Sequence, residues 1–274
     1  MGVEVLVKGD DKNDFPLAVC IVIYNLDLCS SPTFNSLFHQ LPSEKIYIFD
    51  NSIIADVKSK NVESARKYGV NYRKTKNIGL GFTYNGAIDL MKNHCEYIGF
   101  FDQDTFIPKD YISIVINQIN NQKNTSDVFI PHVRANKKVM SPIFKNRYIH
   151  YKKHAVVKSA INSGMFVRTK IFENIKFDEN LFLDYIDHDF FRKLNLRQAA
   201  ISLLPLTLNQ NFSDNEINLQ KALKRFESYW KDTKEYCKIY GTYNYFVAYR
   251  HVLKLTMRYK SADFLKRVIS NAKS

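Results

Sequence analysis

Short apolar runs alternate with amphipathic segments along the first 214 residues of the chain. Three runs, at 18–24, 45–49 and 97–101, are rich in β-branched and aromatic residues. Such runs are typical of parallel strands that are covered on both faces. Between the second and third runs, residues 83–94 have a helical pattern with one apolar face, formed by Tyr84, Ala87, Ile88 and Met91. The alternation predicts an α/β fold with a doubly wound, mostly parallel central sheet.

The pattern changes near residue 215 to long helical periodicity. One apolar stripe consists of Leu219, Ala222, Leu223, Phe226 and Trp230. A second stripe consists of Tyr245, Tyr249, Val252, Leu253 and Thr256. We therefore expect an α/β domain over 1–214 and a helical C-terminal region over 215–274.

The positive charge of the chain is concentrated in this C-terminal region. The formal net charge is +13, and residues 215–274 hold 13 Lys and Arg against 5 Asp and Glu. Arg250, Lys254 and Arg258 share one helix face because they are spaced by four residues. Such a face suits an anionic membrane surface, where each basic residue contributes about 1 kcal/mol. It also suits a solvated face of a helix packed on the main domain, and both interpretations stay open.

Composition excludes several classes of protein. The longest apolar run, at 18–24, is far below the roughly 20 residues that a membrane span needs. Residues 1–14 lack the basic start and apolar stretch of a signal peptide. The four cysteines are scattered, without the spacing of a metal knuckle or a redox pair. We expect a cytoplasmic protein with reduced cysteines.

Polar residues follow each of the three predicted strands. Asn25 follows the first strand, 50–52 (Asp-Asn-Ser) the second, and 102–104 (Asp-Gln-Asp) the third. In open α/β sheets the ligand site lies outside the carboxyl ends of the strands, so these residues should converge. Asp102 and Asp104 would repel each other there unless a hard cation such as Mg²⁺ or Mn²⁺ lay between them. The alternative is an Asx turn or a helix cap.

A glycine-containing loop precedes the predicted helix at 83–94. Gly79 and Gly81 allow a close approach of the backbone, and the following helix N-terminus favours negative charge. The loop suits a diphosphate, although it lacks the third glycine of a dinucleotide fingerprint. A simple glycine turn, with Asn85 only packing, is the alternative.

Asp184, Asp187 and Asp189 lie in an aromatic segment at 177–190. Burial among aromatic side chains raises the pKa of an acid, which suits a general base. The alternative is a helix N-terminus, where the helix dipole favours acids. A helix N-terminus would explain one acid well, but it does not explain a cluster of three, Asp184, Asp187 and Asp189.

In this order, these motifs resemble those of inverting family 2 glycosyltransferases of the GT-A fold, over nearly the whole chain. The segment 182–187 (Phe-Leu-Asp-Tyr-Ile-Asp) is most similar to rhamnosyltransferase-like members, and so is the aromatic-then-Arg pattern at 243–250. The resemblance assigns nucleotide-sugar binding to Tyr24, Asn25, Asp50, Asn51, Asn77, Gly79, Gly81, Asn85, Asp102, Gln103, Asp104, Ser163 and Gly164. It assigns the metal, Mn²⁺ or Mg²⁺, to Asp102 and Asp104, and the role of catalytic base to Asp187.

Two departures from the family pattern bear on this assignment. Ile186 stands where many members have Glu before the base, as it also does in the rhamnosyltransferase-like members. Those members often have a His after the next strand, where this chain has Asn209 and Gln210. A third protein ligand for the metal is therefore in doubt.

The resemblance implies a nucleotide-sugar-binding catalytic domain over 1–214 and a transfer reaction in bacterial surface polysaccharide synthesis. A sugar, with rhamnose favoured, would move from a nucleoside-diphosphate donor to a hydroxyl of a glycan acceptor expected to be lipid-linked. dTDP-rhamnose is the favoured donor and UDP-sugars are the alternative. The enzyme would work in the cytoplasm, with peripheral contact to the inner face of the membrane as an option.

Other classes of function were weighed against this one. A catalytically inactive relative could scaffold a membrane assembly. A nucleic-acid-binding protein could use the basic, tyrosine-rich tail, but the main domain is only mildly basic and we expect no nucleic-acid partner. A nucleotidyltransferase would normally have a Gly- and Lys-rich loop after the first strand, and residues 25–29 have none.

Overall fold

The computed structural model describes residues 5–6, 15–121, 126–135, 138–144, 156–210, 218–241 and 243–270. The strands are β1 Val5–Leu6, β2 Leu17–Ile23, β3 Ile46–Asp50, β4 Asn71–Lys74, β5 Tyr97–Asp102, β6 Thr105–Phe106, β7 Val128–Ala135, β8 Lys138–Ser141, β9 Ile143–Phe144, β10 Val157–Ser159, β11 Met165–Arg168 and β12 Ile201–Gln210. The α-helices are α1 Pro32–Leu37, α2 Ala55–Tyr68, α3 Leu80–Met91, α4 Tyr111–Asn121, α5 Ile186–Leu196, α6 Leu219–Tyr240, α7 Tyr243–Tyr259 and α8 Asp263–Ser270. Short 3₁₀ turns cover Leu28–Ser30, Ser43–Lys45 and Thr169–Glu173.

A ten-stranded mixed sheet forms the centre of the molecule. Its order is β1-β4-β3-β2-β5-β11-β7-β12-β6, with β8 paired to β7. Strands β4, β3, β2 and β5 are parallel, as are β7 and β12, while β11 runs antiparallel to both of its neighbours. The predicted doubly wound, mostly parallel sheet is confirmed.

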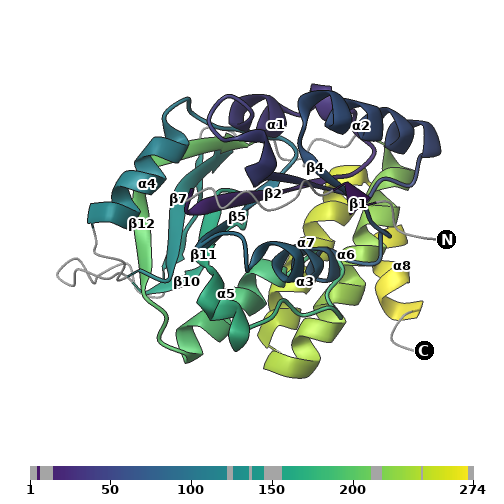
Figure 1. Cartoon of the computed structure of the whole chain (residues 1–274). Coiled ribbons are helices and arrows are strands. Elements are labelled where there is room, and N and C mark those ends of the chain that lie inside the picture. Colours follow the sequence, from purple (N-terminus) through teal and green to yellow (C-terminus); the bar gives the residue numbers. More distant parts are fainter. Residues whose placement is uncertain are drawn as a thin grey trace.

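Helices cover both faces of the sheet, and β2 shows why (Figure 1). Leu17, Val19, Ile21 and Ile23 point into a core shared with α1, α2 and α4, while Ala18 and Cys20 point into a second core shared with α3 and α5. Since successive side chains of a strand point to opposite faces, an unbroken apolar run serves both cores at once. The described helices do not cover the carboxyl ends of the parallel strands, and the polar residues lie at this edge of the sheet.

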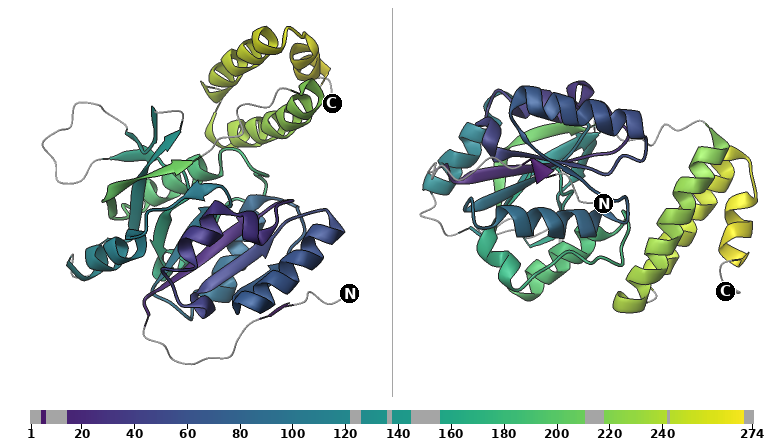
Figure 2. Two further views of the ribbon diagram at one scale, coloured as in Figure 1. Left: turned by 90° about the horizontal axis from the view of Figure 1, so that it is seen from above. Right: turned by 45° about the vertical axis from the view of Figure 1, so that its right-hand side comes forward.

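Helices α6, α7 and α8 have a separate hydrophobic core and lie beside the α/β body (Figure 2). The first predicted stripe is confirmed, because Ala222, Leu223, Phe226 and Trp230 are buried. The second stripe is confirmed in part: Val252 is buried and Tyr245 packs against this core, whereas Tyr249 and Leu253 are 48% and 52% exposed, and Ala248 is buried in addition. The packing of α7 on α6 and α8 therefore buries only part of its apolar stripe.

Two boundaries also differ from the sequence prediction. The helix predicted at 83–94 begins at Leu80 and ends at Met91, because Gly79 at φ 138° serves as its N-cap. Residues 161–168, whose sequence is also strand-like, form a strand only from Met165, because Gly164 at φ 87° forms a turn in which Met165 N–H donates to Asn162 O. The division predicted between residues 214 and 215 falls outside the described residues and stays a prediction.

No helix within the described ranges combines the length and the apolar character that crossing a bilayer requires.

Candidate active site

Hydrogen bonds join the loops that follow β2, β3 and β5 at one edge of the sheet. The backbone N–H of Tyr24 donates to Gln103 Oε1 at 2.8 Å. The backbone N–H of Asn25 donates to Ser52 Oγ at 2.7 Å. The residues predicted to converge from three distant strands therefore do so.

The loop after β2 is held in a fixed shape by Asn25. This residue has φ 49°, a left-handed conformation that Asn tolerates better than most residues. Its Oδ1 accepts hydrogen bonds from the N–H groups of Ile53 at 2.9 Å and Ile54 at 3.3 Å. The backbone and the side chain of Asn25 thus both bind the loop after β3.

Asp50 forms part of the framework beneath these loops. Its side chain is fully buried and accepts hydrogen bonds from Ser52 N at 2.8 Å, Asn61 Nδ2 at 2.8 Å and Tyr72 OH at 2.7 Å. These donors satisfy the carboxylate without any ligand. Direct contact of Asp50 with a nucleotide stays a prediction.

Asn51 links the strand edge to the glycine loop. Its amide donates to Thr83 Oγ1 at 3.0 Å, on the first turn of α3, and its Oδ1 accepts a short hydrogen bond from Thr75 Oγ1. Half-buried Asn77 lies in the turn between these threonines. Asn51 and Asn77 therefore belong to one connected region.

The glycine loop, which contains Gly79 and Gly81, packs directly against the start of the acidic segment at 177–190. A Cβ atom at Gly81 would lie 2.3 Å from Asp178 O, a distance that real Cβ atoms do not reach. Asn85 accepts from Phe177 N–H at 3.0 Å and donates to Phe177 O at 3.0 Å and to Glu179 Oε1 at 2.8 Å. In the structure, Gly81 and Asn85 hold the two segments together, and the alternative of Asn85 as a packing residue fits these contacts.

Asp102 and Asp104 lie around a single amide group. Gln210 Nε2, at the end of β12, donates to Asp102 Oδ2 at 2.9 Å and to Asp104 Oδ1 at 3.2 Å. Gln210 Oε1 is buried and has no hydrogen-bond partner among the described residues. Of the two residues weighed as a third ligand, Gln210 is therefore the one that reaches the pair.

The electrostatics of the pair suit a divalent cation. Burial, and then the charge of Asp104, raises the pKa of Asp102 to about 6, although the Gln210 amide opposes the shift. Burial also raises the pKa of Asp104. Mg²⁺ and Mn²⁺ prefer hard oxygen donors. The two carboxylates would supply such donors, and so would Gln210 Oε1 if the Gln210 amide rotated toward them. Within the described ranges, no group of three or more His, Cys, Asp and Glu residues could hold a metal, so this site needs further oxygens from a ligand or water.

Ser163 and Gly164 pack next to the end of β5, which carries Asp102. Ser163 is fully buried, and its Oγ accepts the backbone N–H of Asp102 at 3.1 Å and lies 2.6 Å from Thr105 Oγ1. A Cβ atom at Gly164 would lie 2.4 Å from Leu208 Cδ1. Both residues therefore fix the end of β5, and their contact with a sugar stays a prediction.

Asp187 lies in the first turn of α5, within electrostatic reach of the acidic pair. Burial raises the pKa of Asp187, the charge of Asp184 adds to this, and His188 opposes it. The charge of Asp187 in turn raises the pKa of Asp102, which places the two carboxylates in one electrostatic environment. The role of Asp187 as the catalytic base stays a prediction.

The other two acids of the segment have partners of their own. Asp189 is fully buried, forms an ion pair with Lys193 Nζ at 2.7 Å and accepts a short hydrogen bond from Tyr240 OH. Asp184 binds the guanidinium of Arg225 through two hydrogen bonds of 2.6 and 2.7 Å. Asp187 is therefore the acid of the three that is best suited to a base.

Two groups near this centre were not predicted as functional from the sequence. Tyr84 was predicted only as a core residue, yet its buried hydroxyl has no partner among the described residues, and the charges of Asp102 and Asp187 raise its pKa after burial does. Asp232, on α6, accepts three backbone N–H groups of the acidic segment. A usable signal for Asp232 was its place on a stripe of tyrosines, Tyr229, Tyr236 and Tyr240, where an acid is unexpected.

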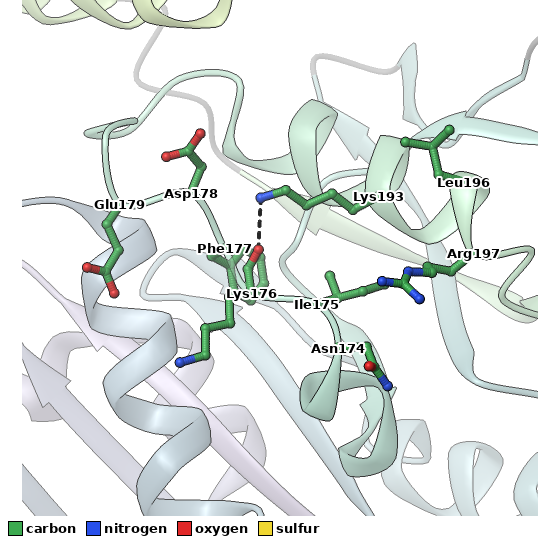
Figure 3. Close-up of a pocket in the computed structure, with 9 residues that line it drawn as sticks. All are labelled: Asn174, Ile175, Lys176, Phe177, Asp178, Glu179, Lys193, Leu196 and Arg197. Atoms are coloured by element: carbon green, nitrogen blue, oxygen red, sulfur yellow. Dashed lines mark hydrogen bonds between the residues drawn. The ribbon is translucent and has the colours of Figure 1, made fainter. Parts of the chain in front are cut away.

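A hollow of about 550 Å³ lies between the start of the acidic segment and α5 (Figure 3). It is lined by residues 174–179 and by Lys193, Leu196 and Arg197, and Lys193 Nζ donates there to Lys176 O at 2.9 Å. Its described lining includes none of the predicted site residues. The candidate site is defined by the converging strand ends and not by this hollow.

Comparisons with known proteins identify the fold. No protein-family model and no curated protein sequence matches the chain. The structure is similar to S. aureus TarS residues 1–349, with a TM-score of 0.53, 20% identity, and coverage of 81% of this chain and 66% of that one. With the TarS 1–349 complex with UDP-GlcNAc the TM-score is 0.56, with 19% identity and coverage of 81% and 67%. GalNAc-T7 with UDP, GalNAc and Mn²⁺ matches with a TM-score of 0.57, 12% identity, and coverage of 74% and 45%.

These structures define the class of fold. The chain has the α/β architecture of GT-A glycosyltransferases, with a mixed, mostly parallel sheet and C-terminal helices. It spans about two thirds of the length of TarS 1–349. At identities of 12–20%, the similarity establishes the fold, and activity has to be argued from the site.

Proposed function

We propose that the chain is a metal-dependent glycosyltransferase that moves a sugar from a nucleoside-diphosphate donor to a hydroxyl group with inversion at the anomeric carbon. The observation that carries this proposal is the meeting of Asp102, Asp104 and Gln210 at the carboxyl edge of the sheet, with Asp187 in the same electrostatic environment. The domain over 1–214 would carry these groups, and the region over 215–274 would support them.

The metal would be held by Asp102 and Asp104, with Gln210 as a third protein donor. When bound, a divalent cation neutralises the diphosphate and makes it a better leaving group. Asp102 and Asp104 would help to orient the donor through this cation. Their charges also keep other anions out of the site until a cation has bound.

Asp187 would accept the proton of the acceptor hydroxyl as it attacks the anomeric carbon. Because the pKa of Asp187 is raised, it lies closer to the working pH than that of an ordinary Asp, and its carboxylate is a stronger base. One base is enough, because the diphosphate leaves as a stabilised anion and needs no second carboxylic acid, unlike the alkoxide in glycoside hydrolysis. A base on one face of the sugar ring and a leaving group on the opposite face would favour inversion at the anomeric carbon.

The donor is proposed from two partly different sources. The sequence resemblance favours dTDP-rhamnose, while the matched structures hold UDP or UDP-GlcNAc. Both nucleotides have a pyrimidine base, and the loops at Tyr24, Asn25 and Asn51 are the proposed base and ribose contacts. A lipid-linked glycan acceptor and a role in bacterial surface polysaccharide synthesis remain part of the proposal.

An anionic membrane surface is the proposed partner of α7. Arg250, Lys254 and Arg258 are all exposed on this helix. Beside them lie exposed apolar residues, of which Phe246 is 63% and Met257 72% exposed. A helix that presents basic and apolar groups together binds the headgroup region of an anionic bilayer. Such contact would place the enzyme on the cytoplasmic face, next to a lipid-linked acceptor.

Point variants test this membrane contact better than deletion of the tail, because α6 also contacts the acidic segment. We expect Arg250→Glu combined with Lys254→Glu to weaken binding to vesicles of phosphatidylglycerol and phosphatidylcholine by at least tenfold. Lys224→Glu combined with Lys231→Glu on α6 is the matched charge control, since both lysines are also exposed. Equal vesicle binding by all three proteins would contradict the membrane contact.

Release of nucleoside diphosphate tests the proposed reaction. The protein is incubated with Mn²⁺ and with dTDP-rhamnose, UDP-GlcNAc, UDP-galactose or UDP-galactofuranose, with and without a membrane extract as acceptor source. We expect release from one donor, dependent on Mn²⁺, stimulated by the extract and lost in Asp187→Asn. No release from any donor would favour the inactive scaffold, and an RNA mobility shift insensitive to Mn²⁺ and nucleotide would favour a nucleic-acid-binding protein.

A further inference from the structure

The segment 182–189, which carries Asp187, is bound along its length by one face of α6. We call this face the α6 clamp and define it by Arg225, Tyr229, Asp232, Tyr236 and Tyr240. Its residues are spaced by three or four positions, so they form a single stripe on the helix. The stripe lies beside the apolar core that α6 shares with α7 and α8, which is built on Ala222, Leu223, Phe226 and Trp230, and Tyr229 also packs against that core.

Asp232 provides the central contact of the α6 clamp. Its carboxylate is fully buried and accepts the successive backbone N–H groups of Phe182, Leu183 and Asp184 at 2.8, 2.8 and 2.7 Å. Three consecutive donors on one carboxylate define the path of the backbone. Phe182 O accepts the N–H of Leu80 at 2.7 Å, so the same residue also joins the start of α3.

Tyr185 is the second point of attachment. It has φ 64°, a strained conformation for a residue with a side chain, and it is the N-cap of α5. Its ring stacks on Tyr236 at 4.7 Å and on Tyr229 at 5.9 Å between centroids, and its hydroxyl lies 3.1 Å from Tyr229 OH. Because Tyr185 O accepts the N–H of Asp189, the conformation of Tyr185 decides where α5 begins.

Arg225 and Tyr240 bind the acids on either side of the base. Arg225 forms two parallel hydrogen bonds with the carboxylate of Asp184, and Tyr240 donates to Asp189. Both neighbours of Asp187 are thereby tied to α6, while the Asp187 carboxylate itself is left to its own helix turn, where Oδ1 accepts the N–H of His188 at 2.8 Å.

We propose that the α6 clamp is a positioning device for the base: its residues fix the backbone that aims Asp187, and they touch neither donor nor acceptor. This proposal rests on the proposed function for its catalytic consequence. It adds that the C-terminal helical region is needed for the chemical step as well as for location. The opposing interpretation is that these contacts only attach the helical region to the α/β body.

The test uses the full-length protein and four variants. Asp232→Asn keeps the shape of the side chain but replaces one acceptor oxygen by a donor, so it cannot accept all three N–H groups. Arg225→Met removes the two hydrogen bonds to Asp184, and Arg225→Lys restores the charge without the bidentate geometry. Lys231→Met, on an exposed position of α6, is the matched control.

Hydrogen exchange gives a readout that does not depend on activity. We expect the amides of Phe182, Leu183 and Asp184 to exchange at least tenfold faster in Asp232→Asn, while amides of β2 and β5 exchange as in the parent. In the same protein we expect kcat to fall about 10- to 100-fold, with the KM for donor within about threefold. Arg225→Met should lose kcat and Arg225→Lys should recover part of it, with Lys231→Met unchanged.

Three results would overturn the proposal. Unchanged exchange at Phe182–Asp184 would show that Asp232 does not hold the segment. Faster exchange with unchanged kcat would show attachment alone, and a KM that rises in step with the loss of kcat would assign the clamp to the donor pocket. If the parent turns over no sugar nucleotide, the proposed function fails, and the catalytic role of the clamp fails with it whatever the exchange data show.

Discussion

Replacement of Asp102 by Asn should stabilise the protein in the absence of divalent cations while removing its metal site. The pKa of Asp102 lies at about 6 in the folded chain, against about 3.9 for an ordinary Asp. At 1.36 kcal/mol for each pKa unit, the ionised carboxylate costs the folded state about 3 kcal/mol above pH 7. Because the carboxyl is only partly shielded from solvent, we expect Asp102→Asn to recover about 1–3 kcal/mol.

The pH dependence of this gain follows from the direction of the shift. A raised pKa means that the folded state binds the proton more tightly than the unfolded state, so stability falls as pH rises from about 4 to 6 and then levels off. The gain from Asp102→Asn should therefore be full above about pH 7 and about half as large at pH 5. For a chain of this length, 1–3 kcal/mol corresponds to a rise in Tm of about 2–10 °C.

Thermal unfolding in EDTA at pH 7.5 and at pH 5 measures this effect directly. Addition of Mn²⁺ should then raise the Tm of the parent but not that of Asp102→Asn. A variant that is no more stable than the parent at pH 7.5, or a gain that is larger at pH 5, would refute the account of two buried carboxylates in mutual repulsion.

Three further predictions follow from the same site. Asp187→Asn should lower kcat by several orders of magnitude and leave donor binding within a few-fold in calorimetry, since the base acts only in the transition state; a matching loss of binding would count against it. Gly164→Ala should destabilise the protein by about 2–5 kcal/mol in denaturant unfolding, from its φ of 87° and its 2.4 Å contact with Leu208, whereas Gly86→Ala on α3 should be neutral or stabilising. Metal-dependent nucleotide affinity should fall about tenfold for each pH unit below 6, as protons compete for Asp102, and a flat profile from pH 7 to 5 would contradict this.

The strand ends of this site were accessible from the sequence because local pattern determines them. The β-branched run at 18–24 had to be a central strand, and the residues after it had to lie at the carboxyl edge. Gln210 was considered as a ligand because it lies where the rhamnosyltransferase-like members often have a His. In these cases short-range sequence carries the information.

The remaining features depend on contacts between distant parts of the chain. Asp232 lies 48 to 50 residues from the N–H groups that it accepts, and no local pattern predicts that pairing. The packing of α7 on α6 and α8 decides which residues of its apolar stripe are buried. Gly81 is required because Asp178 O lies where a side chain would begin, which becomes visible only once the two segments are placed together.

The most direct test of a nucleotide-sugar site at Asp102 and Asp104 is the thermal shift with dTDP, UDP, GDP and CDP, each with and without Mn²⁺. A ligand at 100 times its Kd stabilises a protein by about 2.7 kcal/mol, so binding should be plain in the Tm. We predict a Mn²⁺-dependent shift with one pyrimidine nucleotide, abolished by Asp104→Asn. No shift with any nucleotide, or a shift that persists in Asp104→Asn without Mn²⁺, would contradict the assignment.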